Sequence, residues 1–332
     1  MATGLPTELV AAADLAGATS RRLRGRSDVW RVDHPMGAVV IRRNDPVRHP
    51  PVDATVTDDI GWVHRFLGRL AASAFPAPRP APLFAGRSVA VFEGAVWEAL
   101  AFVPGRVVGW SPTPTMFQLG AFLASFHEAT AELESFGDRA SVLPVASLVG
   151  DVPWRELKVV KSERHAVQAS VEALASELDA TGHRSAPRSV IHGDFTNHNV
   201  VASGRPRVPS GAIDFANAYT EATLADVGFA LWRSGRPSQG ASGFDAERIA
   251  AYVAGYQSRR SLDPGGGAAI LAYLRARGLQ ILAKQVRHGG PVDLGPLPRL
   301  TWLADHQPRL LRRLEAWPRS GIGSGPRREP QR

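Results

Sequence analysis

The sequence contains no cysteine, so it can form no disulfide bond and offers no thiolate as a nucleophile or metal ligand. It also lacks the run of 18 apolar residues that a membrane-spanning helix needs. Its first residues include Glu8 and Asp14, where a signal peptide would be apolar. We therefore expect a cytoplasmic protein with no membrane partner.

Lysine is scarce, because the chain has only Lys158, Lys161 and Lys284 and residues 1–157 contain none. The formal net charge of +8 therefore reflects arginines, which are scattered along the chain apart from a concentration near its C-terminus. A nucleic-acid-binding protein usually has a basic stripe interleaved with aromatic residues, and no such stripe is visible. We expect no nucleic-acid partner.

The 332 residues, 44% of them hydrophobic, are enough for one large domain or two modest ones. In the first third of the chain, short alternating stretches predict an antiparallel sheet, and a helical stretch interrupts them. The predicted strands are at 29–32, 39–41, 88–92 and 96–102, and the predicted helix is at 58–72.

In the rest of the chain the pattern becomes helical, most clearly around 116–126, where apolar residues recur every three or four positions. We expect a sheet-containing N-lobe at 1–105, a helical C-lobe at 106–318 and a disordered tail at 319–332. Such a division creates a cleft between two lobes, where sites for small molecules commonly lie.

Two short apolar stretches each end in polar residues: "VI" precedes "HGDFTNHN", and "AI" precedes Asp214. If the two stretches are paired strands, their ends bring Asp194, Asn199 and Asp214 to one edge of a hairpin. Mg²⁺ prefers oxygen ligands, so Asn199, Asp214 and nucleotide phosphates would form a plausible set. Asp194 would remain to accept a proton from a substrate hydroxyl, as phosphoryl transfer requires. Taken alone, an Asp-x4-Asn segment is also typical of a turn rich in Asp and Asn.

The segments "HGDFTNHN" and "AIDFANA" resemble the catalytic and metal-binding segments of the aminoglycoside phosphotransferase family. Further similar segments are "VVIRR", "FPAPRP", "WEALAFVPGR" and "QLGAFLASFHEA", so the resemblance extends over most of the chain. It implies an α+β, two-lobed, protein-kinase-like fold with a small antiparallel-sheet N-lobe and a larger, mainly helical C-lobe. It also implies an enzyme, a monomer or homodimer, that uses ATP and Mg²⁺ to phosphorylate a hydroxyl of a small molecule.

The resemblance also assigns roles to individual residues. By this resemblance Asp194 is the catalytic base, Asn199 and Asp214 bind Mg²⁺, and Phe102 and Val103 lie beside the adenine. His192 belongs to the same catalytic segment, where we expect it to brace the loop by hydrogen bonding rather than to do chemistry.

The sequence departs from the kinase pattern in its phosphate-binding residues. Protein kinases hold the nucleotide phosphates with a lysine on the third strand, whereas this chain has Arg42 at the similar position, and a guanidinium can bind phosphate oxygens bidentately. The glycine-rich loop is also reduced, because Gly25 is its single glycine. We expect the turn that contains Gly25, Ser27 and Asp28 to present backbone amides to the phosphates.

The resemblance leaves the roles at two further positions undecided. Val63 stands where such families commonly have the glutamate that pairs with the third-strand cation, and Asp59, one helical turn earlier, is a possible substitute. Asp226 matches a position that usually braces the catalytic loop, but it is equally well explained as a carboxylate near a helix N-terminus.

Two alternative functions are compatible with the sequence: a catalytically inactive, kinase-like nucleotide-binding protein, and a metal-dependent hydrolase. A hydrolase with two metal ions needs further His and Asp clusters, and the other histidines stand singly. Arginines are at least as abundant as acidic residues after the polar segments. We therefore expect a neutral or carboxylate-bearing alcohol as acceptor more than a strongly cationic one.

Overall fold

The computed structural model describes the chain in nine segments. They are residues 5–23, 28–35, 37–44, 54–110, 112–133, 136–139, 141–204, 208–288 and 294–316. The predicted tail at 319–332 lies outside the described residues, as do Gly25 and Ser27. None of the helices in the described segments is long and apolar enough to cross a membrane.

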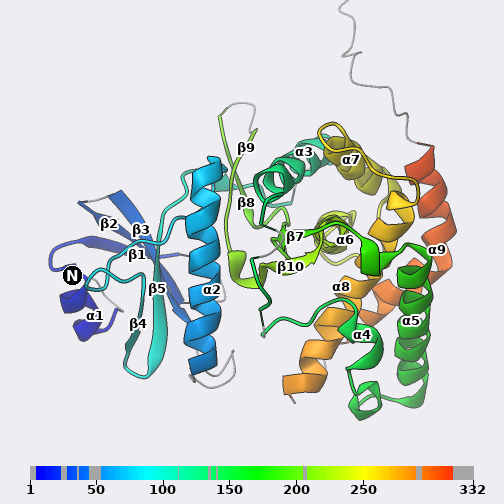
Figure 1. The fold of residues 1–332 in the computed structure, drawn as a ribbon, viewed down its shortest axis with the longest axis horizontal. Helices are drawn as coiled ribbons and strands as arrows, with labels where there is room; N and C mark the ends of the chain where they lie inside the picture. Colours follow the sequence, from blue (N-terminus) through cyan, green and yellow to red (C-terminus); the bar gives the residue numbers. More distant parts are fainter. Residues whose placement is uncertain are drawn as a thin grey trace, which may run out of the picture.

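Five antiparallel strands form a sheet at one end of the molecule, in the order β1-β2-β3-β5-β4 (Figure 1). They are β1 (Thr19–Arg22), β2 (Asp28–His34), β3 (Gly37–Asn44), β4 (Val89–Phe92) and β5 (Ala95–Ala101). The short helix α1 (Thr7–Ala12) packs on one face, where Leu9, Trp30, Ile41 and Trp97 belong to a small core. Because neighbouring side chains of a strand point to opposite faces, Arg42 faces away from this core.

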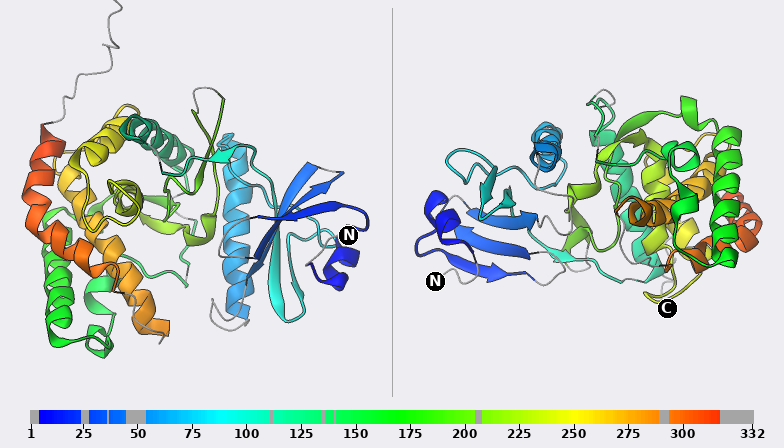
Figure 2. Two further views of the ribbon diagram at one scale, coloured as in Figure 1. Left: turned by 180° about the vertical axis from the view of Figure 1, so that it is seen from behind. Right: turned by 90° about the horizontal axis from the view of Figure 1, so that it is seen from below.

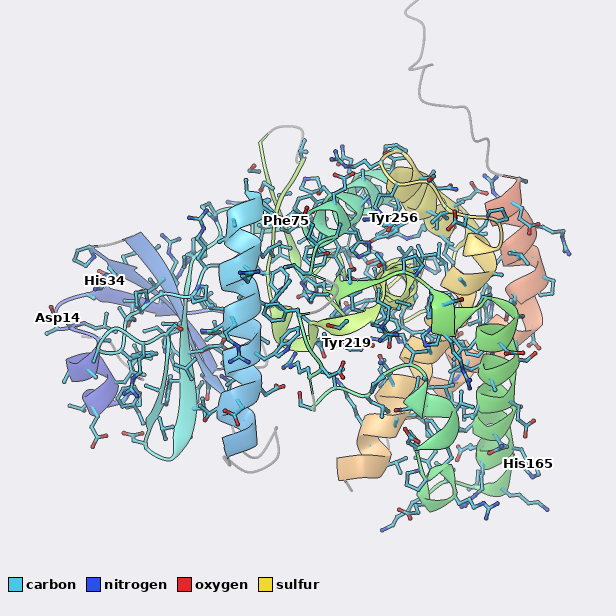
Figure 3. All side chains as sticks on the ribbon, in the orientation of Figure 1. Asp14, His34, Phe75, His165, Tyr219 and Tyr256 are labelled. Atoms are coloured by element: carbon cyan, nitrogen blue, oxygen red, sulfur yellow. The ribbon has the colours of Figure 1, made fainter. Side chains whose placement is uncertain are left out.

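The helix α2 (Ala54–Leu70) stands between the sheet and the rest of the molecule, and the short turn η1 (Ala71–Ser73) follows it (Figure 1). Its apolar side chains, Phe66 among them, belong to the large core of the helical part rather than to the small core of the sheet. The Phe66 ring lies 6.4 Å from that of Phe126 and 6.0 Å from that of Phe215. Phe75, labelled in Figure 3, stacks on Phe122 and extends this contact. Aromatic packing therefore fixes α2 to the helical part.

Two small sheets lie within the helical part. One contains β6 (Arg106–Val107), β8 (Val200–Ser203) and β9 (Val208–Ala212), and the other pairs β7 (Arg188–Ile191) with β10 (Tyr219–Ala222). The predicted pairing of the "VI" strand with the "AI" strand is therefore wrong, because these stretches end β7 and β9 of different sheets. The turn η4 (Phe215–Asn217) reverses the chain after Asp214, so the segment beyond the turn meets β7 instead.

Seven helices among the described residues form the rest of the fold (Figure 1 and Figure 2). They are α3 (Thr113–Ala129), α4 (Ser147–Gly150), α5 (Lys161–Ala180), α6 (Thr223–Ser234), α7 (Ala246–Gln257), α8 (Gly266–His288) and α9 (Leu297–Glu315), with the turns η2 (Trp154–Glu156) and η3 (His183–Ser185) between them. The predicted periodicity around 116–126 corresponds to α3.

Helices α3 and α7 pack with their backbones in contact. A Cβ atom at Gly120 of α3 would lie 1.9 Å from the carbonyl oxygen of Tyr252, and one at Gly255 of α7 would lie 1.9 Å from that of Phe117. No side chain fits at either position, so the two glycines permit the close approach of the helices.

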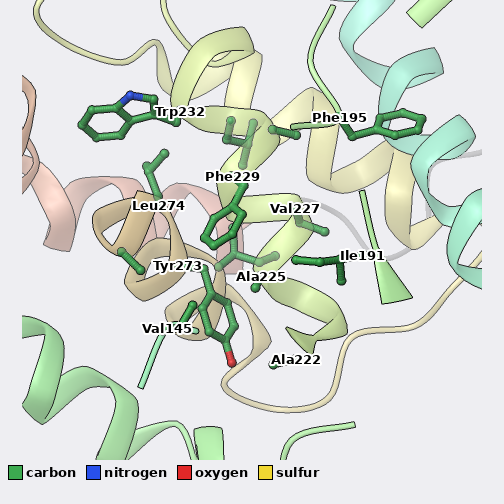
Figure 4. Packing of buried hydrophobic residues seen from close by; sticks show 14 of the residues in the cluster. Val145, Ile191, Phe195, Ala222, Ala225, Val227, Phe229, Trp232, Tyr273 and Leu274 are labelled. Carbon is green, nitrogen blue, oxygen red and sulfur yellow. The ribbon is translucent and has the colours of Figure 1, made fainter. Parts of the chain in front are cut away.

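Helix α6 runs through the centre of the large core. Figure 4 shows its Phe229 and Trp232 beside Leu274 and Tyr273 of α8. A Cβ atom at Gly228 would come within 2.6 Å of the main-chain nitrogen of Leu274, so these two helices also pack closely. Because α6 is buried along most of its length, it is a rigid support for the loops that contact it.

Candidate active site

A cavity of about 1090 Å³ lies between the five-stranded sheet and the helical part. Residues from both sides line it, and among them are six that the sequence predicted to bind or react with substrates: Arg42, Phe102, Val103, Asp194, Asn199 and Asp214. Asp28 does not line it but pairs with Arg22 and Arg43 instead. The expected phosphate-binding turn is otherwise outside the described residues at Gly25 and Ser27.

The loop that follows β7 is anchored by Asp226, a fully buried residue of α6. Its carboxylate accepts hydrogen bonds from the main-chain nitrogens of His192, at 2.7 Å, and Gly193, at 2.9 Å. Gly193 has a positive φ of 72°, and a Cβ atom there would lie 2.2 Å from the carbonyl oxygen of Asn217. Only glycine suits this turn, and Asp226 braces it as the resemblance implied.

His192 joins the loop to the segment that contains Asp214. Its ring Nε2 donates to the carbonyl oxygen of Ile213 at 3.0 Å, and its Nδ1 accepts from the main-chain nitrogen of Asp194 at 3.3 Å. The ring is fully buried and does not line the cavity. These contacts give His192 the bracing position that we expected of it within the catalytic segment, and they place it outside the cavity lining.

Asp194 lies in the cavity between an amide and a guanidinium. Asn199 donates its Nδ2 hydrogens to the main-chain oxygen and the Oδ2 atom of Asp194, both at 2.9 Å. Arg277 of α8 approaches Oδ1 of the same carboxylate at 3.3 Å. The Asp194 side chain is 24% exposed, so a small molecule in the cavity can reach it.

Asp214 lines the same cavity. It has a positive φ of 63°, a conformation that aspartate tolerates better than most residues. The main-chain nitrogen of its neighbour Ile213 donates to the carbonyl oxygen of Asn199 at 2.8 Å, and the Phe215 ring lies 4.4 Å from that of His192. Asp194, Asn199 and Asp214 therefore lie on two loops that are directly bonded to each other.

Arg42 connects the sheet to Asp214. Its Nη1 donates to Oδ1 of Asp214 at 2.9 Å, and its Nε donates to Oε1 of Glu98, the residue opposite on β5. Burial would lower the pKa of the Arg42 guanidinium, but the charges of Glu98 and Asp214 outweigh burial and raise it. The cation thus holds carboxylates from both sides of the cavity.

The acidic partner of Arg42 is Glu98 and not Asp59, the expected substitute. Glu98 is 1% exposed, and its carboxylate also accepts hydrogen bonds from Asn44 at 3.2 Å and from His64 of α2 at 2.9 Å. Burial would raise the pKa of Glu98, but the charge of Arg42 and the hydrogen bonds from His64 and Asn44 outweigh it and lower the pKa to about 2. Glu98 is therefore a carboxylate at neutral pH.

Asp59 pairs with Arg139 and not with Arg42. Its carboxylate binds the guanidinium of Arg139 and the hydroxyl of Ser141. Arg139 in turn donates to the carbonyl oxygens of Ala216 and Ala218, both at 2.8 Å, in the turn that follows Asp214. Asp59 thus ties α2 to the turn beside Asp214, while Val63 lines the cavity as an apolar residue.

Sequence reasoning missed Glu98 and Arg277 as parts of the site. The signal for Glu98 was present, because it is the single charged residue in the apolar stretch "AVWEALAF", and a charge inside a buried strand needs a partner. Arg277 had no such signal, because it is one of many arginines in the second half of the chain.

A model of the phosphotransferase enzyme family matches residues 19–264. A homoserine kinase of Caulobacter sp. (strain K31) is 25% identical over 247 residues, which cover 73% of this chain and 74% of the relative. A homoserine kinase of Gluconacetobacter diazotrophicus is 30% identical over 218 residues, which cover 61% of this chain and 62% of the relative.

Solved structures are similar over almost the whole chain. A microcompartment-associated aminopropanol kinase has a TM-score of 0.65 at 21% identity, and the match covers 94% of this chain and 99% of the other. Amicoumacin kinase hAmiN has a TM-score of 0.60 at 14% identity, and the match covers 93% of each chain. These similarities confirm the predicted α+β, kinase-like fold.

Proposed function

Because the chain belongs to the phosphotransferase enzyme family, we propose that it transfers the γ-phosphate of ATP to a hydroxyl group of a small molecule, with Mg²⁺ as the metal ion. The observation that carries this proposal is the composition of one cavity. Its lining residues include two carboxylates, an amide and a guanidinium that suit this chemistry: Asp194, Asp214, Asn199 and Arg42. Phosphoryl transfer needs these groups, one to accept a proton and the others to neutralise and position phosphates.

The residues present fit a magnesium ion. The Asp214 carboxylate and the side-chain oxygen of Asn199 are hard oxygen donors, which Mg²⁺ prefers. Because Asn199 directs its Nδ2 at Asp194, its Oδ1 is the atom left for a ligand contact, and the Asp214 side chain is 46% exposed. We infer that these two residues hold the metal, which when bound neutralises charge on the nucleotide phosphates.

Asp194 is the proton acceptor in this proposal. Asn199 and Arg277 fix its carboxylate by hydrogen bonds, so it can orient the acceptor hydroxyl. The hydroxyl oxygen forms a bond to the γ-phosphorus, its proton passes to Asp194, and the bond from the γ-phosphorus to the bridging oxygen breaks. ADP leaves with that electron pair.

The nucleotide would lie against the sheet side of the cavity. Arg42 is anchored through its Nε by Glu98, so its Nη groups can bind phosphate oxygens, as a guanidinium does bidentately. Phe102 and Val103, also in the cavity lining, supply apolar contacts for the adenine.

The test is a turnover assay with the full chain, Mg²⁺-ATP and a panel of small hydroxylated compounds, with ADP release and phosphorus NMR as readouts. We expect a phosphoester product, and a kcat that falls ~10²-fold or more in Asp194→Asn with little change in the KM for ATP. Asp33→Asn, a change in an exposed pair with Arg31, is the matched control.

Two results would contradict the proposal. One is an Asp194→Asn variant as active as the Asp33→Asn control. The other is magnesium-dependent nucleotide binding without phosphorylation of any alcohol, which would favour a catalytically inactive nucleotide-binding protein.

A further inference from the structure

Arginines line the part of the cavity that lies against the end of α6. Arg233 is in the last turn of this helix, and Arg236 follows it. Three carboxylates line the described cavity, and the structure gives each a cationic partner: Glu98 and Asp214 bind Arg42, and Asp194 binds Arg277. No carboxylate of the described lining is therefore left for a positively charged substrate group.

Arg236 is held in place by contacts that do not neutralise it. Its Nε donates to the carbonyl oxygen of Arg233 at 3.4 Å, and its Nη1 donates to that of Gln239 at 2.6 Å. The guanidinium also lies 5.7 Å from the ring centre of Trp110. A guanidinium has five N–H donors, so three remain, and Arg236 has no ion pair with a carboxylate in the described part of the chain.

The charge of Arg236 is costly in this position. The residue is 9% exposed, and burial of a cation without a counter-ion is unfavourable. Burial lowers the pKa of the Arg236 guanidinium, and the like charge of Arg233 lowers it further. An anion between the two guanidiniums would remove both penalties, and a guanidinium suits carboxylate and phosphate oxygens.

His198 lines the same cavity as the two arginines and Asp194. Its ring Nε2 is buried and has no hydrogen-bond partner among the described residues. A buried polar atom without a partner is unfavourable, so a bound molecule that hydrogen-bonds to this nitrogen would be stabilised here.

We propose that the acceptor is an alcohol with an anionic group, a carboxylate or a phosphate, which binds Arg233 and Arg236 while its hydroxyl faces Asp194. The inference rests on the proposed function and sharpens it, because it excludes an ammonium group as the main recognition element. Like charges repel an amino alcohol from this part of the cavity, whereas an anionic alcohol neutralises it.

The test uses four alcohols with the same three-carbon skeleton: glycerate, glycerol 3-phosphate, glycerol and 3-aminopropane-1,2-diol. Binding to the full chain is measured by NMR titration with Mg²⁺ and a non-hydrolysable ATP analogue. The proteins are the wild type, Arg233→Met, Arg236→Met and the control Arg259→Met, which breaks an exposed pair with Glu128. Thermal unfolding verifies that each variant is folded.

We expect at least one of the two anions to bind the wild type and the control about 10- to 100-fold more tightly than Arg233→Met and Arg236→Met, the range for loss of a hydrogen bond to a charged group. Glycerate and glycerol 3-phosphate distinguish a carboxylate from a phosphate. We also expect glycerol and the amino alcohol to bind the wild type at least 10-fold more weakly than that anion.

Three outcomes would overturn the inference: amino alcohol binding as tight as that of the anions, anion affinity equal in Arg233→Met and the control, or binding of neither anion. If the arginines only stabilise the C-terminal end of α6, their variants melt earlier at unchanged affinity. Failure of the proposed function is seen separately, either as absence of magnesium-dependent nucleotide binding in a titration without acceptor or as absence of ADP release with every alcohol of the panel.

Discussion

Replacement of Glu98 by glutamine tests whether a buried charge on the sheet positions the cation of the cavity. Glu98 is 1% exposed. Burial alone would raise its pKa, but the charge of Arg42 and the hydrogen bonds to the carboxylate lower the pKa from 4.5 to about 2. The difference between these pKa values corresponds to about 3 kcal/mol of folding free energy at neutral pH. Glutamine keeps the size of the side chain but leaves Arg42 without this charge, so we expect a loss of about 3 kcal/mol.

The pH dependence of this loss has a definite sign. A carboxylate whose pKa is lowered on folding stabilises the folded protein above the unfolded pKa, here 4.5, and the stabilisation is lost as the pH falls toward the folded pKa of about 2. In urea titrations, the difference between wild type and Glu98→Gln should therefore be equal at pH 7 and pH 5.5. It should become smaller below pH 4.5.

Glu128→Gln is the matched control, because Glu128 forms an exposed pair with Arg259 that should contribute less than about 1 kcal/mol. We also expect Glu98→Gln to raise the KM for Mg²⁺-ATP, since Arg42 loses the anchor of its Nε. The reasoning is refuted if Glu98→Gln destabilises the protein no more than Glu128→Gln, or if its loss of stability persists undiminished at the lowest pH at which the protein folds.

Three further predictions concern the metal, the helix packing and a buried histidine. Asp214→Asn should raise the Mg²⁺ concentration for half-maximal activity at least ~10-fold, and an unchanged magnesium titration would exclude Asp214 as a ligand. Gly120→Ala should lower the free energy of unfolding by about 2 kcal/mol or more, because its Cβ would lie 1.9 Å from a carbonyl oxygen of α7. The control Gly68→Ala has open space around it and should stabilise α2. Equal effects of the two substitutions in urea titrations would disprove the contact. Burial lowers the pKa of His127 below 6.5, so the unfolded state binds the proton at a higher pH than the folded state. The free energy of unfolding should therefore fall by up to ~1.4 kcal/mol per pH unit as the pH drops below 6.5. The same slope in His127→Gln would show that another group causes this pH dependence.

Local patterns predicted much of the fold. Alternation and helical spacing indicated four of the five strands of the first sheet, all except β1, together with α2 and α3. The two polar segments predicted which loops would approach each other. The comparisons confirm the family and the fold. The residue roles in catalysis and metal binding stay predictions until the variants are measured.

What the sequence did not reveal depends on pairing between distant segments. Arg42 meets Glu98 because β3 and β5 are neighbours in the sheet, although the two residues are 56 positions apart in the sequence. The pairing of β7 with β10 likewise requires the turn after Asp214, which apolar spacing does not predict. Asp59 was misassigned for the same reason, since Arg139 lies far away in the sequence.

The use of arginine in place of lysine at the cavity has a consequence for chemical labelling. Among the described residues that line the cavity none is a lysine, and Arg42 stays protonated at any pH that the fold tolerates. Acylating reagents built on a nucleotide require a free amine, so we expect them to find no target there. Dicarbonyl compounds, which condense with guanidinium groups, are the reagents that should mark this cavity, and bound nucleotide should protect it.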